Sequence, residues 1–309
     1  MNAIRIFVLL FALTCAADAQ VPMTGAGLPV PIASAPPYTG PGDVVSGAFA
    51  WHGLRAYNSA TRGAALVNVC NSTGGVDVAC ADMVSDATTG ALVPATIGLI
   101  TCPGTNCTIK TWYDQGSTGT NITQAVVANR AALTASCLGS LPCATFTAAN
   151  SENYQSSGTI SQAQPWTIIQ VTNRVSGTSG QAGLMTNGSA GQGNVPFGFL
   201  YAFAPNYNTV YDSGDGSFLN GSANDNSVNI FIGLISGASS VLYTNNVATT
   251  GSSVTTAAGG TIAIGSVFSS FYLDGTFFEG GMWPSGFNAT QAGNMCHNLY
   301  AYWGTAVSC

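Results

Sequence analysis

The segment Thr101–Ala125, which reads TCPGTNCTIKTWYDQGSTGTNITQA, is the most informative part of this chain. Cys102 and Cys107 enclose four residues, a spacing that suits a small disulfide loop at the start of a strand. Thr108–Tyr113 then alternates β-branched and aromatic residues with polar ones. This alternation predicts a half-buried β-strand.

Two polar residues, Asp114 and Gln115, follow this strand directly. A strand end that runs into a loop can present its side chains to a ligand, so both residues are candidates for hydrogen bonds to a sugar. The alternative is that they bind the backbone of the loop itself, as Asx residues in turns often do. The residues alone leave both interpretations open.

The same kind of short strand recurs along most of the chain, between turns rich in Gly, Ser, Asn and Thr. Asp274-Gly275 and Asn245-Asn246 predict two-residue hairpin turns, because these residue types accept positive φ angles. The predicted strands are Ala64–Val69, Thr108–Tyr113, Thr167–Thr172, Phe197–Phe203, Val228–Leu234, Ser240–Tyr243, Thr261–Gly265, Ser270–Leu273 and Thr276–Trp283. The chain is therefore expected to be all-β.

Two helices are predicted beside the strands. A short one is expected within Ser46–Ala60, around Leu54–Tyr57. A longer one is expected over Asn288–Trp303, where Asn288 can cap the start, apolar residues recur at helical spacing and Gly304 can end the helix.

The N-terminus has the pattern of a secretory signal, with an apolar run at Ile6–Cys15 and an Ala-x-Ala cleavage site at Ala17–Ala19. This run is too short to span a membrane, and no other segment is long enough. We therefore expect a signal peptide at residues 1–19, a Pro- and Gly-rich leader at 20–43 and one domain at 44–309. The protein is expected to be secreted, outside the cell or in the periplasm.

Nine cysteines become eight if Cys15 leaves with the signal. An even number in an exported chain predicts disulfides. Eight cysteines allow 105 connectivities, and pairing of neighbours is favoured here. The expected pairs are Cys70–Cys80, Cys102–Cys107, Cys137–Cys143 and Cys296–Cys309.

Charged residues make up only 6% of the chain, with 6 basic and 12 acidic residues. Without a cluster of basic side chains the chain lacks a groove for phosphates, so nucleic acid is not an expected partner. The only histidines are His52 and His297, and there is no Cys-x-x-Cys, which argues against zinc. A surface of Ser, Thr, Asn, Gln and Gly suits neutral polar partners such as sugars.

Several motifs resemble the catalytic domain of the α-L-arabinofuranosidase B family. They are Gly42-Asp43, Arg55–Tyr57, Gly63–Leu66, the segment from Cys102 to Ala125, and Gly275–Gly280 with the helix that follows it. The resemblance implies a concanavalin-like jelly-roll sandwich of two antiparallel sheets. It also implies a retaining glycosidase, which needs no cofactor or metal and uses a Glu nucleophile and an Asp acid/base.

The expected catalytic residues follow from this resemblance only in part. Thr209–Gly221 matches the nucleophile region but has Asp212 and Asp215 and no Glu, so Asp215 is the candidate nucleophile and Asp212 its neighbour in substrate binding. The family's acid/base position falls in Gly265–Ser270, which has no titratable group, and Asp274 is the nearest candidate acid/base. An Asx-rich turn for the first pair and a hairpin position for Asp274 are the structural alternatives.

For the other residues with reactive or binding side chains, a structural role is favoured. Glu279 is expected to serve the strand, His52 to lie at the surface or in a cap, and at least three of the five tryptophans to be core. Three acidic residues near the Cys70–Cys80 pair offer oxygen ligands for calcium but lack the spacing of a known loop: Asp77, Asp82 and Asp86.

The sequence thus predicts a secreted glycoside hydrolase that releases terminal α-L-arabinofuranosyl groups from arabinose-containing polysaccharides or oligosaccharides. The alternative is a catalytically inactive sandwich of the same fold that binds glycans or serves adhesion, since two expected family carboxylates are absent.

Overall fold

The strand expected at Thr108–Tyr113 is β6 (Cys107–Trp112), in which Cys107, Ile109 and Trp112 are buried and the alternation shifts at an irregularity between Ile109 and Thr111. The computed structural model describes residues 37–175, 181–187, 197–201, 207–212, 217–222, 227–252, 257–267, 271–304 and 309. Within these residues, the compact unit begins at Pro37. Seven residues of the expected leader, 37–43, therefore lie in this unit.

One series of antiparallel strands has β22 (Gly275–Trp283) as its central member. On one side, β22 pairs with β11 (Trp166–Arg174), which is followed by β16 (Asn229–Ile235), β17 (Ser240–Thr244) and β18 (Val247–Gly251). On the other side, β22 pairs with β1 (Ala50–Gly53) and β9 (Leu141–Phe146).

A second antiparallel series has β19 (Ala257–Ile264) between β10 (Tyr154–Ala163) and β12 (Gln181–Asn187). From β12 the series continues with β13 (Phe197–Tyr201), β14 (Tyr207–Asp212) and β15 (Ser217–Ser222). From β10 it continues through β7 (Ile122–Thr123) and β6 to β2 (Ala65–Thr73) and β3 (Val76–Val84). Finally, β8 (Ala132–Leu138) joins β6 to β9.

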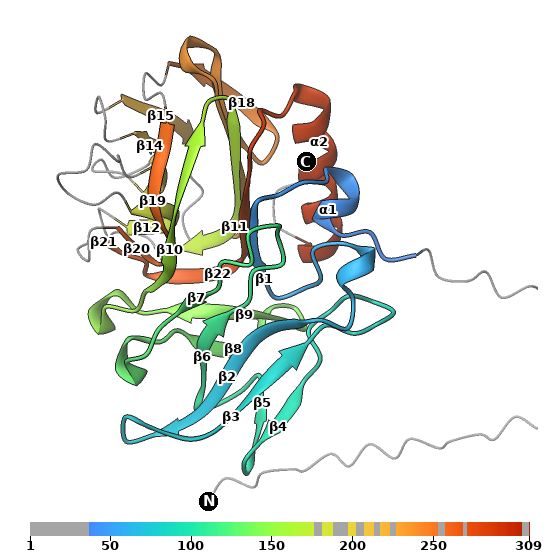
Figure 1. Ribbon diagram of the computed structural model, residues 1–309, viewed down its shortest axis with the longest axis vertical. Helices are drawn as coiled ribbons and strands as arrows, with labels where there is room; N and C mark the ends of the chain where they lie inside the picture. The colour runs from blue at the N-terminus through green and yellow to red at the C-terminus, as the bar shows by residue number, and fades with distance from the viewer. Residues whose placement is uncertain are drawn as a thin grey trace, which may run out of the picture. The chain divides into compact units, whose positions relative to one another are not determined.

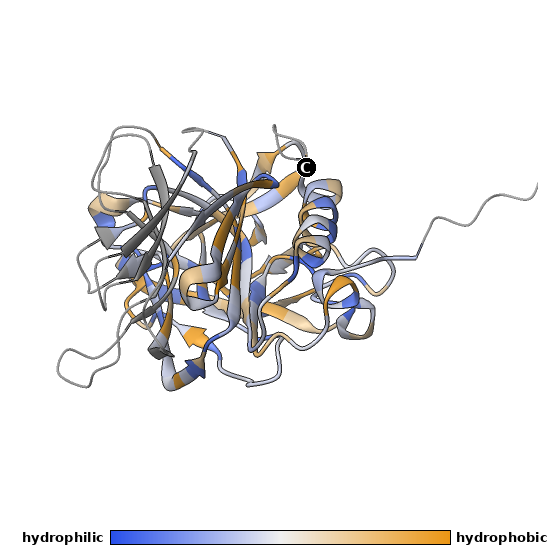
Figure 2. Ribbon diagram, turned by 90° about the horizontal axis from the view of Figure 1, so that it is seen from above, coloured by the Kyte–Doolittle hydropathy of each residue, from blue (hydrophilic) through white to orange (hydrophobic). Residues whose placement is uncertain are grey.

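The two series face one another as the layers of an all-β sandwich, as predicted (Figure 1). A hydrogen bond between layers runs from the Leu184 backbone N–H on β12 to Oε1 of the buried Gln170 on β11, at 2.9 Å. Opposite β17, a Cβ on Gly221 of β15 would lie 2.3 Å from the Thr244 hydroxyl, so glycine permits this contact. The apolar residues gather along the strands between the layers (Figure 2).

The C-terminal helix α2 (Ala289–Trp303) confirms the prediction for this segment. The Asn288 side chain accepts a hydrogen bond from the Gln291 backbone, and Gly304 ends the helix with a positive φ of 59°. Its buried residues recur at helical spacing and pack into the core: Ala292, Met295, Cys296, Leu299 and Trp303. α2 lies beside the short N-terminal helix α1 (Pro41–Val44) (Figure 1).

The helix predicted within Ser46–Ala60 is wrong. This segment instead contains strand β1, which pairs with β22, and a 3₁₀ turn at Ser59–Thr61. All four residues of β1 are buried, so contacts on both of its faces override the local helical pattern. The short N-terminal helix is α1, ahead of this segment.

The two predicted hairpin turns have different outcomes. Asn245 and Asn246 have φ angles of 49° and 67° and join β17 to β18, as predicted. The hairpin at Asp274-Gly275 is wrong, because β21 (Phe271–Tyr272) pairs with β20 (Ser266–Val267) and not with β22. A small hairpin of β4 (Ala95–Ile97) and β5 (Ile100–Cys102) completes the strands.

The four predicted disulfides, Cys70–Cys80, Cys102–Cys107, Cys137–Cys143 and Cys296–Cys309, are all confirmed. In the part of the chain that the structure describes, no helix has the length and apolar character needed to cross a membrane.

Candidate functional site

Asp274, the candidate acid/base, is half-buried between β21 and β22. Its backbone carbonyl accepts a hydrogen bond from Val175 at 2.8 Å, and the preceding Leu273 N–H donates to the Gly265 carbonyl at 2.8 Å. Directly after it, Gly275 lies so close to β11 that a Cβ would be 2.1 Å from the Asn173 carbonyl oxygen. Two other chain segments, the end of β11 and the residues around Gly265, therefore fix the backbone of Asp274.

A second carboxyl group, Glu152, lies at the same end of β22, and the sequence analysis did not single it out. Glu152 is only 5% exposed. Its Oε2 accepts a hydrogen bond from the Thr147 backbone at 2.8 Å, and its Oε1 accepts one from the Asn150 side chain at 3.0 Å. Ser151, at φ 55°, turns the chain between these groups and Glu152.

The strand register brings Asp274 and the residues that bind Glu152 to the same end of β22. The antiparallel pairing of β9 with β22 ends at Phe146 opposite Gly275. The next positions outward are Thr147, which donates to Glu152, and Asp274. Burial raises the pKa of Glu152, the hydrogen bonds from Asn150 and Thr147 oppose this shift, and the charge of Asp274 adds a smaller increase.

Asp212, the predicted neighbour of the nucleophile, is the last residue of β14. Its backbone lies opposite Phe197 of β13 and Ser217 of β15. Phe197 pairs in register with Thr186 of β12, and Thr186 pairs with Ile262 of β19. Asp215, the predicted nucleophile, lies outside the described residues.

Asp114 and Gln115 bind the backbone of their own region. The Asp114 carboxylate accepts hydrogen bonds from the backbone of Trp51 and Gly116, both at 2.8 Å, and from two threonines of its loop, Thr118 and Thr120. The Gln115 side chain accepts from the Tyr57 backbone at 2.7 Å and donates to the Arg55 carbonyl at 3.1 Å. These contacts join the loop to β1 and the segment after it.

His52 was expected at the surface, and this prediction is wrong, because its residue is fully buried on β1. Neither ring nitrogen has a hydrogen-bond partner among the described residues. Burial lowers the pKa of His52, against the opposing charge of Asp114. The side chain is therefore held in its neutral form.

Glu279 serves the interior of the fold, as expected. Its carboxylate forms an ion pair with Arg55 at 2.9 Å, and both residues are fully buried. The Trp303 indole N–H donates to the same carboxylate, and Asn298 accepts from the Arg55 guanidinium at 2.9 Å. This cluster joins β22, the segment after β1 and α2.

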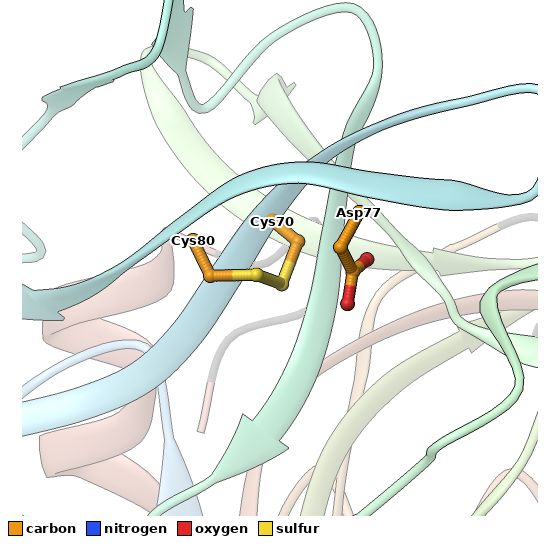
Figure 3. Close-up of side chains that lie close together, drawn as sticks. All are labelled: Cys70, Asp77 and Cys80. Carbon is orange, nitrogen blue, oxygen red and sulfur yellow. A yellow bond between two sulfur atoms is a disulfide. The ribbon is translucent and has the colours of Figure 1, made fainter.

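Cys70, Asp77 and Cys80 lie close together, as three metal ligands would (Figure 3). The two sulfur atoms form a disulfide and so offer no thiolate. Asp77 is bound by Arg130 at 2.6 Å and Lys110 at 3.3 Å, and these interactions lower its pKa. This arrangement does not suit a metal ion.

The other polar candidates also have structural partners. Asp82 accepts hydrogen bonds from Asn68 and Tyr113, and Asp86 accepts from the turn at Thr88 and Thr89. All five tryptophans are at most 1% exposed, more than the predicted three: Trp51, Trp112, Trp166, Trp283 and Trp303. Their rings build the core and do not offer faces to a sugar.

The fold is similar to solved structures of α-L-arabinofuranosidases. An arabinofuranosidase complexed with arabinofuranosyl-α-1,2-xylobiose matches with a TM-score of 0.64 and 14% identity, over 86% of this chain and 65% of that chain. A mutant GH54 α-L-arabinofuranosidase soaked with 4-nitrophenyl α-L-arabinofuranoside gives 0.63 and 14%, over 87% and 66%. A GH54 α-L-arabinofuranosidase soaked with a cyclic sulfate inhibitor gives 0.63 and 13%, over 87% and 66%.

The likeness at these identities is one of fold, and it confirms the resemblance expected from the sequence at that level. The chain spans about two thirds of the length of these enzymes. No family model and no curated protein sequence matches the chain.

Proposed function

We propose that this protein is a secreted glycoside hydrolase that releases terminal α-L-arabinofuranosyl groups from arabinose-containing glycans. The observation that carries the proposal is the sandwich fold, which GH54 α-L-arabinofuranosidases share over 87% of the chain. The low content of charged residues suits a neutral glycan, and four disulfides suit export with cleavage after Ala19.

The proposed reaction is a double displacement by two carboxyl groups. Asp215 attacks the anomeric carbon, and Asp274 protonates the departing oxygen as the glycosidic bond breaks. A water molecule then hydrolyses the covalent intermediate, with Asp274 taking its proton. The half-buried position of Asp274, at a strand start held by two other segments, supports its part in this scheme.

The test is release of nitrophenol from 4-nitrophenyl α-L-arabinofuranoside by the purified protein and by Asp215→Asn and Asp274→Asn. Asp82→Asn is the matched control, because Asp82 is an exposed carboxylate on β3. We expect Asp215→Asn to lose at least about 100-fold in rate because it removes the nucleophile, and Asp274→Asn to lose about 100-fold through the second step, where Asp274 acts as the base, while the control keeps its activity. Equal release by all four proteins, or none above background, would refute the catalytic assignment.

A second candidate function, glycan binding without turnover, is favoured by one observation. Where the family resemblance implies an acid/base Asp, β20 begins with Ser266, a fully buried residue whose hydroxyl has no partner among the described residues. A buried serine cannot protonate a leaving group at neutral pH. Retention of the protein on arabinan or arabinoxylan, without release of arabinose, would support this candidate over the first.

A further inference from the structure

The disulfide between Cys70 and Cys80 differs from the other three in its exposure to solvent. All eight paired cysteines lie in the described part of the chain, and among them Cys80 alone is exposed, while its partner Cys70 is fully buried. Each of the other pairs joins two buried residues, or a buried and a half-buried one. Because thiol–disulfide exchange depends on access to a sulfur atom, this pair is the one that a dissolved thiol reaches first.

The position of the pair at the edge of the sheet decides which sulfur is attacked. Cys70 of β2 and Cys80 of β3 are directly opposite in register, and the disulfide bridges the two strands (Figure 3). Two residues further along each strand, Asn68 and the exposed Asp82 form the next pair on the same face. Since β3 ends its series of strands, solvent lies beyond Cys80. An incoming sulfur therefore meets Cys80, and Cys70 becomes the leaving sulfur.

The charges beside the disulfide balance one another. An oxygen of Asp77 lies within 4.8 Å of both sulfur atoms, and Asp82 adds a second carboxylate on this face. Lys110 and Arg130 both bind Asp77, and the hydrogen bond from Arg130 lowers the pKa of that carboxyl group. Two cations thus offset two carboxylates. A thiolate, which is the anionic species that attacks a disulfide, therefore meets no net negative charge here.

The β2–β3 hairpin has contacts that do not depend on the disulfide. Its ladder of strand pairs extends on both sides of the two cysteines, and Gly74 and Gly75 supply the turn, with φ angles of 61° and 78°. The Cys70 sulfur lies 3.9 Å from Oδ1 of Asn68, which can accept a hydrogen bond from the thiol once the disulfide is open. The reduced cysteines therefore stay opposite one another, and the disulfide can form again.

We propose that Cys70–Cys80 is a thiol–disulfide exchange site, at which a low-molecular-weight thiol forms a mixed disulfide with Cys80. The thiolate attacks Cys80 Sγ, a new S–S bond forms as the Cys70–Cys80 bond breaks, and Cys70 leaves as a thiolate that takes a proton from water. Attack by the Cys70 thiolate on Cys80 Sγ reverses the step and releases the thiol. A second thiol molecule instead attacks the bound one, which leaves both cysteines reduced and the two small molecules joined as a disulfide.

The site is mapped by incubating the oxidised full chain with reduced glutathione at neutral pH and trapping free thiols with an alkylating reagent. Peptide mass spectrometry should find glutathione on Cys80 and the alkyl group on Cys70, and this pair should open at least about tenfold faster than any other. Tryptophan fluorescence should stay that of the folded protein. Opening of another pair first, glutathione on Cys70, or opening only together with a change in fluorescence would each overturn the proposal.

Variants test the assignment independently. Cys70→Ser/Cys80→Ser should remain folded and take up no glutathione, whereas the matched control Cys102→Ser/Cys107→Ser should still take it up at Cys80. Equal uptake by the two double variants would overturn the assignment. If the first variant does not fold, the mapping on the wild type still decides.

The role of the neighbouring charges has its own readout, the rate of glutathione uptake. Lys110→Met leaves a net negative charge beside the disulfide and should slow uptake about twofold to threefold, and Asp82→Asn should accelerate it by a similar factor. Both effects should shrink at high salt. Rates that change in the same direction in the two variants would overturn the role of these charges.

Discussion

Arg55 and Glu279 lie 224 residues apart in sequence and form a fully buried ion pair. The Arg55 guanidinium donates from Nε to both carboxylate oxygens at 3.0 Å and lies 4.4 Å from the centre of the Tyr302 ring. Burial lowers the pKa of Arg55, but the contributions of Glu279, Tyr38 and Tyr302 together raise it by more, so the pKa of Arg55 is raised. The pair connects the segment after β1, the central strand β22 and helix α2.

Replacing Glu279 with Gln should lower the free energy of unfolding by about 3–5 kcal/mol, because it leaves the guanidinium buried without its counter-charge. Urea denaturation monitored by tryptophan fluorescence measures this. The control is Lys110→Met, which breaks the partly exposed pair with Asp77 and should cost at most about 1 kcal/mol. Equal losses in the two variants would contradict the assigned role of burial.

His52 should make the fold sensitive to mild acid. Its pKa is lowered in the folded state, so below the unfolded value of about 6.5 the unfolded chain takes up a proton that the folded chain does not. The free energy of unfolding therefore decreases as the pH falls from 7 towards 5, by at most about 1.4 kcal/mol per pH unit.

The measurement is the difference in unfolding free energy between wild type and His52→Leu at several pH values, which cancels contributions from carboxyl groups. Relative to the wild type, the free energy of unfolding of His52→Leu should increase as the pH falls from 7 to 5. A pH-independent difference for His52→Leu would exclude the buried neutral imidazole.

We expect Asp114 to contribute mainly to the stability of the fold and not to ligand binding. Its carboxylate accepts hydrogen bonds from the backbone of Trp51, Gly116 and Thr120, so Asp114→Ala should cost about 2–3 kcal/mol in thermal unfolding measurements. Asp82→Ala, at an exposed position of β3, should cost less than about 1 kcal/mol. A stable Asp114→Ala protein that has lost binding to arabinan would instead support the sugar-binding interpretation.

The Cys296–Cys309 disulfide closes a longer loop than Cys102–Cys107, with sequence separations of 13 and 5. In the chain-entropy account, a longer closed loop restricts the unfolded state more. The double variant Cys296→Ala/Cys309→Ala should lose about 3 kcal/mol, and the corresponding change of Cys102 and Cys107 about 2 kcal/mol. Chemical denaturation under non-reducing conditions compares them, and the reverse order would contradict the entropic account.

The sequence predicted strands best where side chains of different size and polarity alternate. β6 and β17 are of this kind, and their predicted bounds lie within a residue of the observed ones. β10 (YQSSGTISQA) and the start of β19 (AAGGTIAI) went unpredicted, because their small and polar residues carry little periodic signal. These segments form strands because they pair with neighbouring strands, and their side chains alone do not indicate it.

Candidate site residues were predictable only where one short segment carries them. Asp274 was proposed as the carboxylate nearest to the family's acid/base position and Asp114 from its place at a strand end, and both stay predictions. Glu152 was not predicted, because NSENY is typical of an ordinary polar turn. Its place at the end of β22 follows only from the β9–β22 register. His52 was misplaced for the same reason, since its burial depends on β22 and the Asp114 loop.

The sequence by itself determined the all-β class, the C-terminal helix, the four disulfides and the resemblance of fold. These depend on local patterns or on cysteines separated by 13 residues or fewer. Only the tertiary structure decided that Ser46–Ala60 is not helical, that Asp274-Gly275 is not a hairpin, and that Glu152 is buried. Each of these depends on contacts between segments far apart in the chain, whose free energy exceeds the weak preferences of a few consecutive residues.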